Sequence, residues 1–366
     1  MNTRIAGYDL ARCLALFGLV VASFSSGAGL VEFSLHYLFR IRLRSLMQDG
    51  SIATFLVLGG VGISLLTQRI RVRNDSHASS DSRKQLIKRA VGLLVVGICC
   101  NLIWHTSLLS LYSIYIIIGA LLLTVSNRWL WSLVFVCVAT FVVFRFLVDR
   151  FVDLYEIRLT GQLWASHPWT VEDIVYHLDQ IGFHERFSWM VLLLIGLWLG
   201  RRDVRDPKVR RKLFLSGIIV TLVAEGVFWG LVFGPLGLPS SRYRLAALKW
   251  LVGDASVLWG SLNFLEMCGT AIAIIGASLM LTERYPAAKW TKPFIATGQL
   301  ALTLYVVHLI IDGGLLWALG GSEFETLFSA IGSAVIFCIC GAAFSHFWTK
   351  RFNRGPLEWG IRRITG

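Results

Sequence analysis

The chain has 366 residues, 55% of them hydrophobic, with a mean hydropathy of +0.66 and a formal net charge of +13. Apolar blocks of about 18–22 residues recur along it, which is the length that crosses about 30 Å of hydrocarbon, so a soluble globular protein is excluded. The positive charge does not indicate nucleic acid, because the basic residues gather in alternate loops as the positive-inside rule requires.

We therefore expect an all-α, polytopic membrane protein of about ten spans, forming one integral-membrane domain over residues 1–366. The positive-inside rule puts both termini in the cytoplasm, with residues 349–366 as a cytoplasmic tail and 149–186 as an external cap segment. The seven cysteines show no zinc spacing, so no metal is expected. The expected spans are residues 11–31, 50–67, 89–106, 108–125, 129–148, 187–201, 213–235, 259–282, 293–315 and 326–348.

The first span opens with Arg4, Asp9 and Arg12 at the predicted cytoplasmic boundary. Asp9 and Arg12 are three residues apart, so on a helix they can pair on one face. The pair is either a topology anchor with an ordinary surface ion pair or part of a polar site that holds a donor substrate.

Residues 31–48 should lie outside, yet they carry three arginines. His36, Arg40 and Arg44 recur every four residues, which places them on one helical stripe. The segment is either an amphipathic helix in the outer interface, with its arginines on lipid headgroups, or a helix over a cavity that presents the stripe to a substrate. Asp49 follows at the start of the second span, where it can cap the helix.

Two carboxyl groups lie inside apolar spans: Glu225 in TLVAEGVFWG and Glu266 in SLNFLEMCGT. A charged side chain at the centre of a span costs at least about 2.5 kcal/mol, so each must face the bundle interior, be protonated or be paired. They are either hydrogen-bonded between helices or part of a polar cavity that binds substrate or moves protons.

The stretch GQLALTLYVVHLIID, residues 298–312, holds His308 and Asp312 four residues apart in an apolar run. On a helix such residues can touch, so the carboxylate can orient the imidazole. His308 is either a hydrogen-bonded structural histidine or a general base, because imidazole titrates near neutral pH. His36 is the rival base.

The tail reads Phe352-Asn353-Arg354-Gly355-Pro356-Leu357-Glu358-Trp359, followed by Arg362. This stretch resembles the closing signature of the YeiB family of bacterial inner-membrane proteins, whose domain has no assigned function. Further echoes of that family are Gly298, Ala301-Leu302-Thr303 and Tyr305, Asp9-Leu10-Ala11-Arg12, Phe55 with Gly60-Val61-Gly62, Tyr112, and Gly196 with Gly200-Arg201.

The family is similar to the transmembrane acyltransferases, which have an Asp-x-x-Arg motif in the first span, an early histidine outside and a late Tyr-x-x-His motif. Tyr305-Val306-Val307-His308 fits the late motif. The YeiB pattern has Gln where this chain has His308, so here the chain moves toward the acyltransferase pattern.

The resemblance implies an acyltransferase of the bacterial inner membrane that moves an acyl group, most simply acetyl, from cytoplasmic acyl-CoA to a hydroxyl or amine. The expected partners are the bilayer, acyl-CoA and a small-molecule, sugar or lipid acceptor; a homodimer is left open. Two alternatives are a transporter with a proton-relay cavity and an intramembrane enzyme of the cyclase type. The expected residues are His308, Asp312 and His36 for catalysis, Arg4, Asp9 and Arg12 for acyl-CoA, and Arg40, Arg44, Asp49, Glu225, Glu266 and Tyr305 for the substrate cavity.

Overall fold

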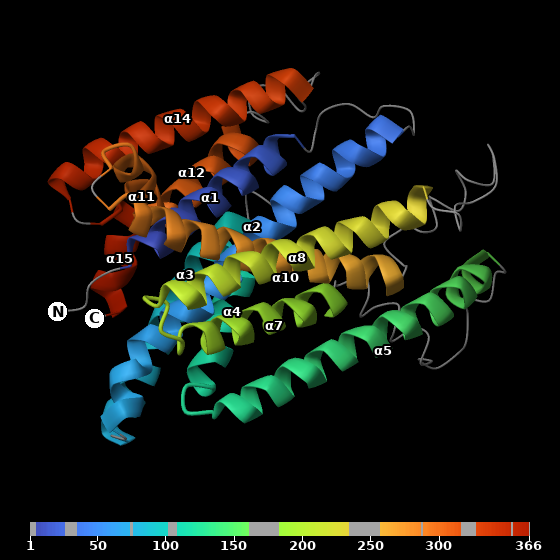
Figure 1. Ribbon diagram of the computed structural model, residues 1–366, viewed down its shortest axis with the longest axis horizontal. Coiled ribbons are helices and arrows are strands. Elements are labelled where there is room, and N and C mark those ends of the chain that lie inside the picture. Colours follow the sequence, from blue (N-terminus) through green and yellow to red (C-terminus); the bar gives the residue numbers. More distant parts are fainter. Residues whose placement is uncertain are drawn as a thin grey trace.

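The computed structural model describes residues 5–25, 35–73, 76–101, 108–160, 183–233, 257–286, 288–315, 327–352 and 354–365. Within these ranges the chain is helical and forms no strand, as the composition predicts. Most of the long helices run roughly along one axis of the bundle (Figure 1). The all-α membrane fold is confirmed.

The first half of the bundle is built from α1 (Ala6–Phe24), α2 (Leu35–Arg73), α3 (Ser76–Asn101), α4 (Leu108–Leu121), α5 (Asn127–Thr160) and α7 (Phe183–Leu199). The second half comprises α8 (Pro207–Phe233), α10 (Val257–Arg284), α11 (Thr291–Gln299), α12 (Ala301–Leu309), the π-helix η1 (Ile310–Leu315), α14 (Leu327–Arg351) and α15 (Pro356–Thr365).

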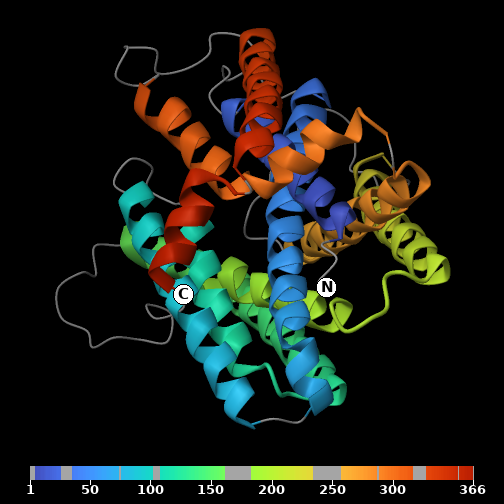
Figure 2. The same cartoon turned by 90° about the vertical axis from the view of Figure 1, so that its left-hand side faces the viewer.

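The helix α1 is central, because it packs against α2, α10, α11 and α14. The closest helix pairings besides these are α8 with α10 and α2 with α7. We call the end where α1 begins and α14 ends the basic end; it is at the left of Figure 1. There α15 packs against α3, and Figure 2 shows the two side by side.

Six described helices are long and apolar enough to cross a membrane, and a seventh span results if one bent pair is counted as a single span. About ten spans were expected, and that count is not confirmed. Two of the expected spans are shorter apolar helices, Leu108–Leu121 and Trp189–Leu199, and α3 does not qualify because its first half is polar and charged. The expected span 293–315 is the bent pair: α11 and α12 meet at an angle of 74°.

Residues 35–48 belong to α2, a single helix of 39 residues, so the described part of the expected segment 31–48 is the beginning of a long helix. Of the expected cap 149–186, residues 149–160 extend α5 and 183–186 begin α7; residues 161–182 lie outside the described ranges. The expected tail 349–366 contains α15, which packs against α3 and α12.

Small residues allow a close helix crossing between α2 and α7. A Cβ added to Gly60 of α2 would overlap the Leu193 carbonyl oxygen of α7, and one added to Gly196 would overlap the Val57 carbonyl oxygen. Glycines at such positions let two backbones approach closely in a membrane. The crossing also buries a row of α7 leucines, among them Leu192 and Leu194.

We predict that Gly196→Ala destabilises the protein, because the new methyl group must push α7 away from the α2 backbone. Overpacking of this kind costs about 1–3 kcal/mol. The measurement is the thermal unfolding midpoint in detergent. Gly226→Ala is the control, since a Cβ at Gly226 meets nothing within 4 Å, and equal midpoints for the two variants would contradict the crossing.

Candidate functional site

A cavity of about 650 Å³ lies at the basic end of the bundle, between α1, α2, α3, α4, α7, α11, α12 and α15. This is within the usual range of about 300–1,000 Å³ for small-molecule and cofactor pockets. The α2 residues in its wall run from Leu66 to Ile52, a rise of about 21 Å at 1.5 Å per residue. The cavity therefore follows α2 from the basic end toward the middle of the bundle.

Four arginines and one carboxylate line this cavity: Arg12, Arg89, Arg354, Arg362 and Glu358. Burial lowers the pKa of Arg89, and the positive charges of Arg362 and Arg354 lower it further. Like charges held this close disfavour one another, and a bound anion would stabilise them. Arginine also matches the geometry of phosphate and carboxylate oxygens through paired N–H donors. This part of the cavity suits an anionic group.

The remaining wall is largely apolar and aromatic. Such a surface suits an acyl chain or another hydrocarbon group. The cavity thus combines a positively charged part with an apolar part. This combination is complementary to an anionic amphiphile. The apolar and aromatic residues in the wall are Ile52, Phe55, Leu56, Leu66, Leu93, Leu108, Leu109, Leu111, Tyr112, Tyr115, Trp189, Leu302 and Tyr305.

Asp9 and Arg12 form the ion pair that their spacing predicts, with Nη1 of Arg12 2.9 Å from Oδ1 of Asp9. The Asp9 side chain is 2% exposed and that of Arg12 is 34% exposed, so a buried carboxylate holds an arginine that reaches the cavity. Gly298 packs against this turn, because a Cβ there would overlap the Asp9 carbonyl oxygen. Arg4, expected beside them, lies outside the described residues.

Glu358 of α15 caps the helix that begins after the bend. Its Oε1 accepts hydrogen bonds from the backbone N–H groups of Leu302 and Thr303, at 2.9 and 3.2 Å, and its Oε2 accepts one from the Thr303 hydroxyl at 2.5 Å. The first N–H groups of a helix have no partner within it, and a carboxylate there also faces the positive end of the helix dipole. A residue from the tail therefore accepts hydrogen bonds from backbone amides that have no partner within the helix because of the bend.

The tail signature explains how this cap is held in place. The Leu357 N–H donates to the Thr303 hydroxyl oxygen at 3.2 Å. A Cβ on Gly355 would overlap Glu358 Oε2 and press on the Thr303 hydroxyl. The same stretch brings Arg354 and Arg362 to the cavity, so the signature builds the cap and the arginine cluster together.

His308 and Asp312 have different hydrogen-bond partners. His308 is 1% exposed, and its Nδ1 is 2.6 Å from the Tyr305 carbonyl oxygen. Asp312 accepts a hydrogen bond of 2.5 Å from the Ser23 hydroxyl. Asp312 lies in the π-helix η1, whose wider turn rotates it away from the direction that four-residue α-helical spacing predicts.

The contact of His308 still fixes its tautomer. A carbonyl oxygen only accepts hydrogen bonds, so Nδ1 carries the proton and Nε2 is left as an acceptor. His308 lies against Tyr305, with ring centroids 5.1 Å apart, and Tyr305 lines the cavity and accepts a hydrogen bond of 3.1 Å from the Leu108 N–H. The Tyr305 side chain thus lies between His308 and the cavity. The side chain of His36 lies outside the described residues.

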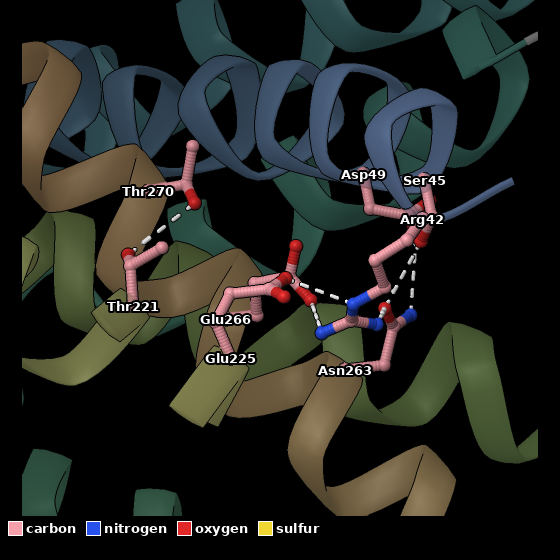
Figure 3. Close-up of polar contacts among 8 residues, drawn as sticks. All are labelled: Arg42, Ser45, Asp49, Thr221, Glu225, Asn263, Glu266 and Thr270. Carbon is pink, nitrogen blue, oxygen red and sulfur yellow. Dashed lines mark hydrogen bonds and ion pairs between the residues drawn. The ribbon is translucent and has the colours of Figure 1, made fainter. Parts of the chain in front are cut away.

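A second polar group is buried where α2, α8 and α10 meet (Figure 3). Arg42 is 4% exposed; its Nε donates to Glu225 Oε1 at 2.8 Å, and its Nη2 forms an ion pair with Glu266 Oε2. Asn263 Oδ1 lies 3.4 Å from Nη1 of Arg42, and the guanidinium stacks over the Phe228 ring with 4.9 Å to its centroid.

Asp49 belongs to the same cluster. Its Oδ2 accepts hydrogen bonds from the Ser45 hydroxyl at 2.7 Å and the Asn263 amide at 3.1 Å. The hydroxyl oxygens of Thr221 and Thr270 lie 3.4 Å apart and join α8 to α10 nearby (Figure 3). The cluster therefore ties three helices together, and its members are absent from the lining of the cavity.

The structure separates residues that we expected in one substrate cavity. Tyr305 lines the cavity, whereas Asp49, Glu225 and Glu266 lie in the Arg42 cluster. Arg40 and Arg44 are two residues to either side of Arg42 on α2, so they point to a different face of the helix. Among the described residues, no group of three or more His, Cys, Asp or Glu could hold a metal ion.

Sequence reasoning did not select Arg42, Arg354, Arg362 and Glu358 as site residues, and it considered Arg89 only as part of the basic segment 68–89, which would attract CoA phosphates. The tail signature was the available signal for Arg354, Glu358 and Arg362. For Arg42 a weaker signal existed, since it is the arginine that does not fall on the stripe of Arg40 and Arg44.

These features define a polytopic helical membrane protein with an arginine-lined cavity and a buried ion cluster. Residues 206–366 match the family model described as "Protein of unknown function (DUF418)", so the C-terminal part of the chain carries that domain. The match agrees with the resemblance of the tail to a membrane family without an assigned function. The relation to acyltransferases is a prediction from that resemblance.

Among curated proteins, the chain is similar to the "Uncharacterized protein YxaH" of Bacillus subtilis (strain 168). The two are 29% identical over 76 residues, which is 20% of this chain and 19% of that protein. The chain thus matches about a fifth of the relative's length, and the name of that relative assigns no activity.

We predict that Glu358→Ala loosens the start of α12, because the Leu302 and Thr303 amides lose their acceptor. Leaving such donors unpaired costs about 1–3 kcal/mol. Hydrogen exchange at these two amides should accelerate and the thermal midpoint should fall. Glu358→Gln should lower the thermal midpoint less, because the Gln side-chain oxygen still accepts hydrogen bonds from these two N–H groups.

Arg363→Gln is the matched control, since Arg363 stacks on Trp359 of the same helix and does not line the cavity. Unchanged exchange at Leu302 and Thr303 in Glu358→Ala would show that the cap does not hold α12.

Proposed function

We propose that this protein is a membrane acyltransferase that binds acyl-CoA in the arginine-lined cavity and transfers its acyl group to a hydroxyl or amine. One observation carries the proposal: four arginines and an apolar, aromatic wall line the same cavity. Acyl-CoA is complementary to this lining, since it combines negatively charged phosphates with a thioester-linked acyl group. The late Tyr-x-x-His motif and the Asp-x-x-Arg motif support it.

In this reaction the acceptor oxygen or nitrogen attacks the thioester carbon. A C–O or C–N bond forms, the C–S bond breaks, and the proton of the acceptor passes through the base to the departing thiolate. His308 is the proposed base, because its Nε2 is the acceptor nitrogen; the Tyr305 carbonyl, rather than Asp312, orients the ring. Asp312 would act at a distance, through Ser23 and η1.

Arg12, Arg89, Arg354 and Arg362 would bind the phosphates, with Asp9 holding Arg12. The basic end would face the cytoplasm, where acyl-CoA is made, in the bacterial inner membrane. The length of the cavity along α2, about 21 Å, supports a donor that reaches from that face toward the membrane centre. The acceptor is a sugar, lipid or other small molecule with a hydroxyl or amine.

A transporter is the second candidate, and the buried Arg42 cluster favours it. Ionisable groups buried between membrane helices are typical of proton relays. The two functions differ in one measurement: a transporter moves its substrate into liposomes in response to a pH gradient without consuming acyl-CoA.

We predict that the double variant Arg354→Gln, Arg362→Gln binds acetyl-CoA at least about tenfold more weakly than the parent protein, since each charged hydrogen bond contributes about 1.5–3 kcal/mol. Equilibrium binding of radiolabelled acetyl-CoA to purified protein is the measurement. Arg363→Gln should bind like the parent. Equal affinity in the double variant and the parent, or no binding by the parent, would contradict the donor site.

We predict that His308→Ala abolishes acyl transfer or acetyl-CoA hydrolysis while acetyl-CoA still binds. Asp312→Asn should lower the rate less, because the Tyr305 carbonyl keeps the imidazole oriented. Release of CoA thiol and label in a membrane extract are the readouts. Full turnover in His308→Ala together with loss in His36→Ala would transfer the role of base to His36.

A further inference from the structure

The Arg42 cluster contains more carboxyl groups than its arginine can balance. Glu225 and Glu266 both contact the guanidinium of Arg42. Their side chains are 20% and 2% exposed, between helices with apolar faces. One guanidinium neutralises one carboxylate, and a second carboxylate left uncompensated in a membrane is far less stable than its neutral acid.

The two carboxyl groups also face each other. Figure 3 shows them side by side at the Arg42 guanidinium, so a negative charge on one carboxyl group disfavours a negative charge on the other. Two ionised carboxylates cannot hydrogen-bond, because neither has a donor. A contact between them is stable only when one of them holds a proton.

One oxygen of Glu266 has no hydrogen-bond donor beside it in the described part of the chain. Its Oε1 is buried and has no hydrogen-bond donor among the described residues. Glu225 Oε1 already accepts from Arg42 Nε. Buried polar atoms in native proteins are nearly always hydrogen-bonded, so this oxygen is expected to accept a hydrogen bond. A single proton placed between the two glutamates supplies that donor.

We propose that Glu225 and Glu266 form a binding site for one exchangeable proton, which the two carboxyl groups share beside Arg42. The charged groups that act on Glu266 are Arg42, Glu225 and Asp49. Asp49 is held by Ser45 and Asn263 and has Arg44 as a nearby positive charge. The shared proton leaves Arg42 and the glutamate pair neutral together. This site does not depend on acyl transfer.

The test is infrared spectroscopy of the purified full-length protein at neutral pH, in H2O and D2O. The parent protein should show the C=O band of a protonated carboxyl group that shifts in D2O. Glu225→Gln and Glu266→Gln should each remove one such group, because the carboxylate that remains is balanced by Arg42. The double Gln variant should lose the same single group and no more.

Glu283→Gln is the control, since Glu283 is 54% exposed and pairs with Arg210 at the basic end; it should remove only a carboxylate band. Thermal midpoints provide an independent measurement. Each single Gln variant should unfold near the parent, whereas the double variant should unfold well below it, because Arg42 then has no carboxylate partner in the pair.

Loss of the acid band in one single variant and not in the other would overturn sharing, because one glutamate would then hold a proton without its neighbour. A parent protein without a protonated carboxyl band at neutral pH would overturn the site outright, even if the variants fail to fold. The acetyl-CoA binding experiment is unaffected by either result, so the two proposals fail separately.

Discussion

The hydrogen bonds of Glu358 are the interaction on which the basic end of the bundle depends. A span that bends by 74° exposes backbone amides at the start of its second half, and inside a membrane such amides have no water to bind. The Glu358 carboxylate satisfies them from the tail. One residue thereby allows the bend, anchors α15 and helps to bring Arg354 and Arg362 to the cavity. The tail is a part of the membrane domain's structure rather than an appendage.

The same physical constraint shapes the other buried polar group. Charged side chains between membrane helices are stable when they are paired and hydrogen-bonded. Arg42 meets this condition with partners from α8 and α10, and α2 thereby acquires contacts along its length that apolar packing alone would not orient. Polar groups thus specify how the helices are arranged at both places, while glycine and leucine contacts supply the close packing between them.

Local sequence patterns predicted those features that depend on neighbours in the chain. Hydrophobic block length gave the helical membrane class, and three-residue spacing gave the Asp9–Arg12 pair. Features that depend on distant residues were not predictable. The partners of Arg42 lie 183 and 221 residues away along the chain, and the residue that permits the bend near Leu300 lies 56 residues after Leu302. Gly298 lies two residues before Leu300, but a single glycine does not predict an angle of 74°. Four-residue spacing likewise could not reveal that the turn after His308 becomes a π-helix.

The length of α2 has a mechanical consequence. A helix of 39 residues is about 58 Å long and behaves as a single rod. It carries Arg42 near one end and the cavity wall, from Ile52 to Leu66, toward the other, and the tight crossing with α7 at Gly60 lies within that wall. The crossing therefore holds α2 against α7 where the cavity lies. One continuous helix thus sets the positions of both the Arg42 cluster and the cavity wall.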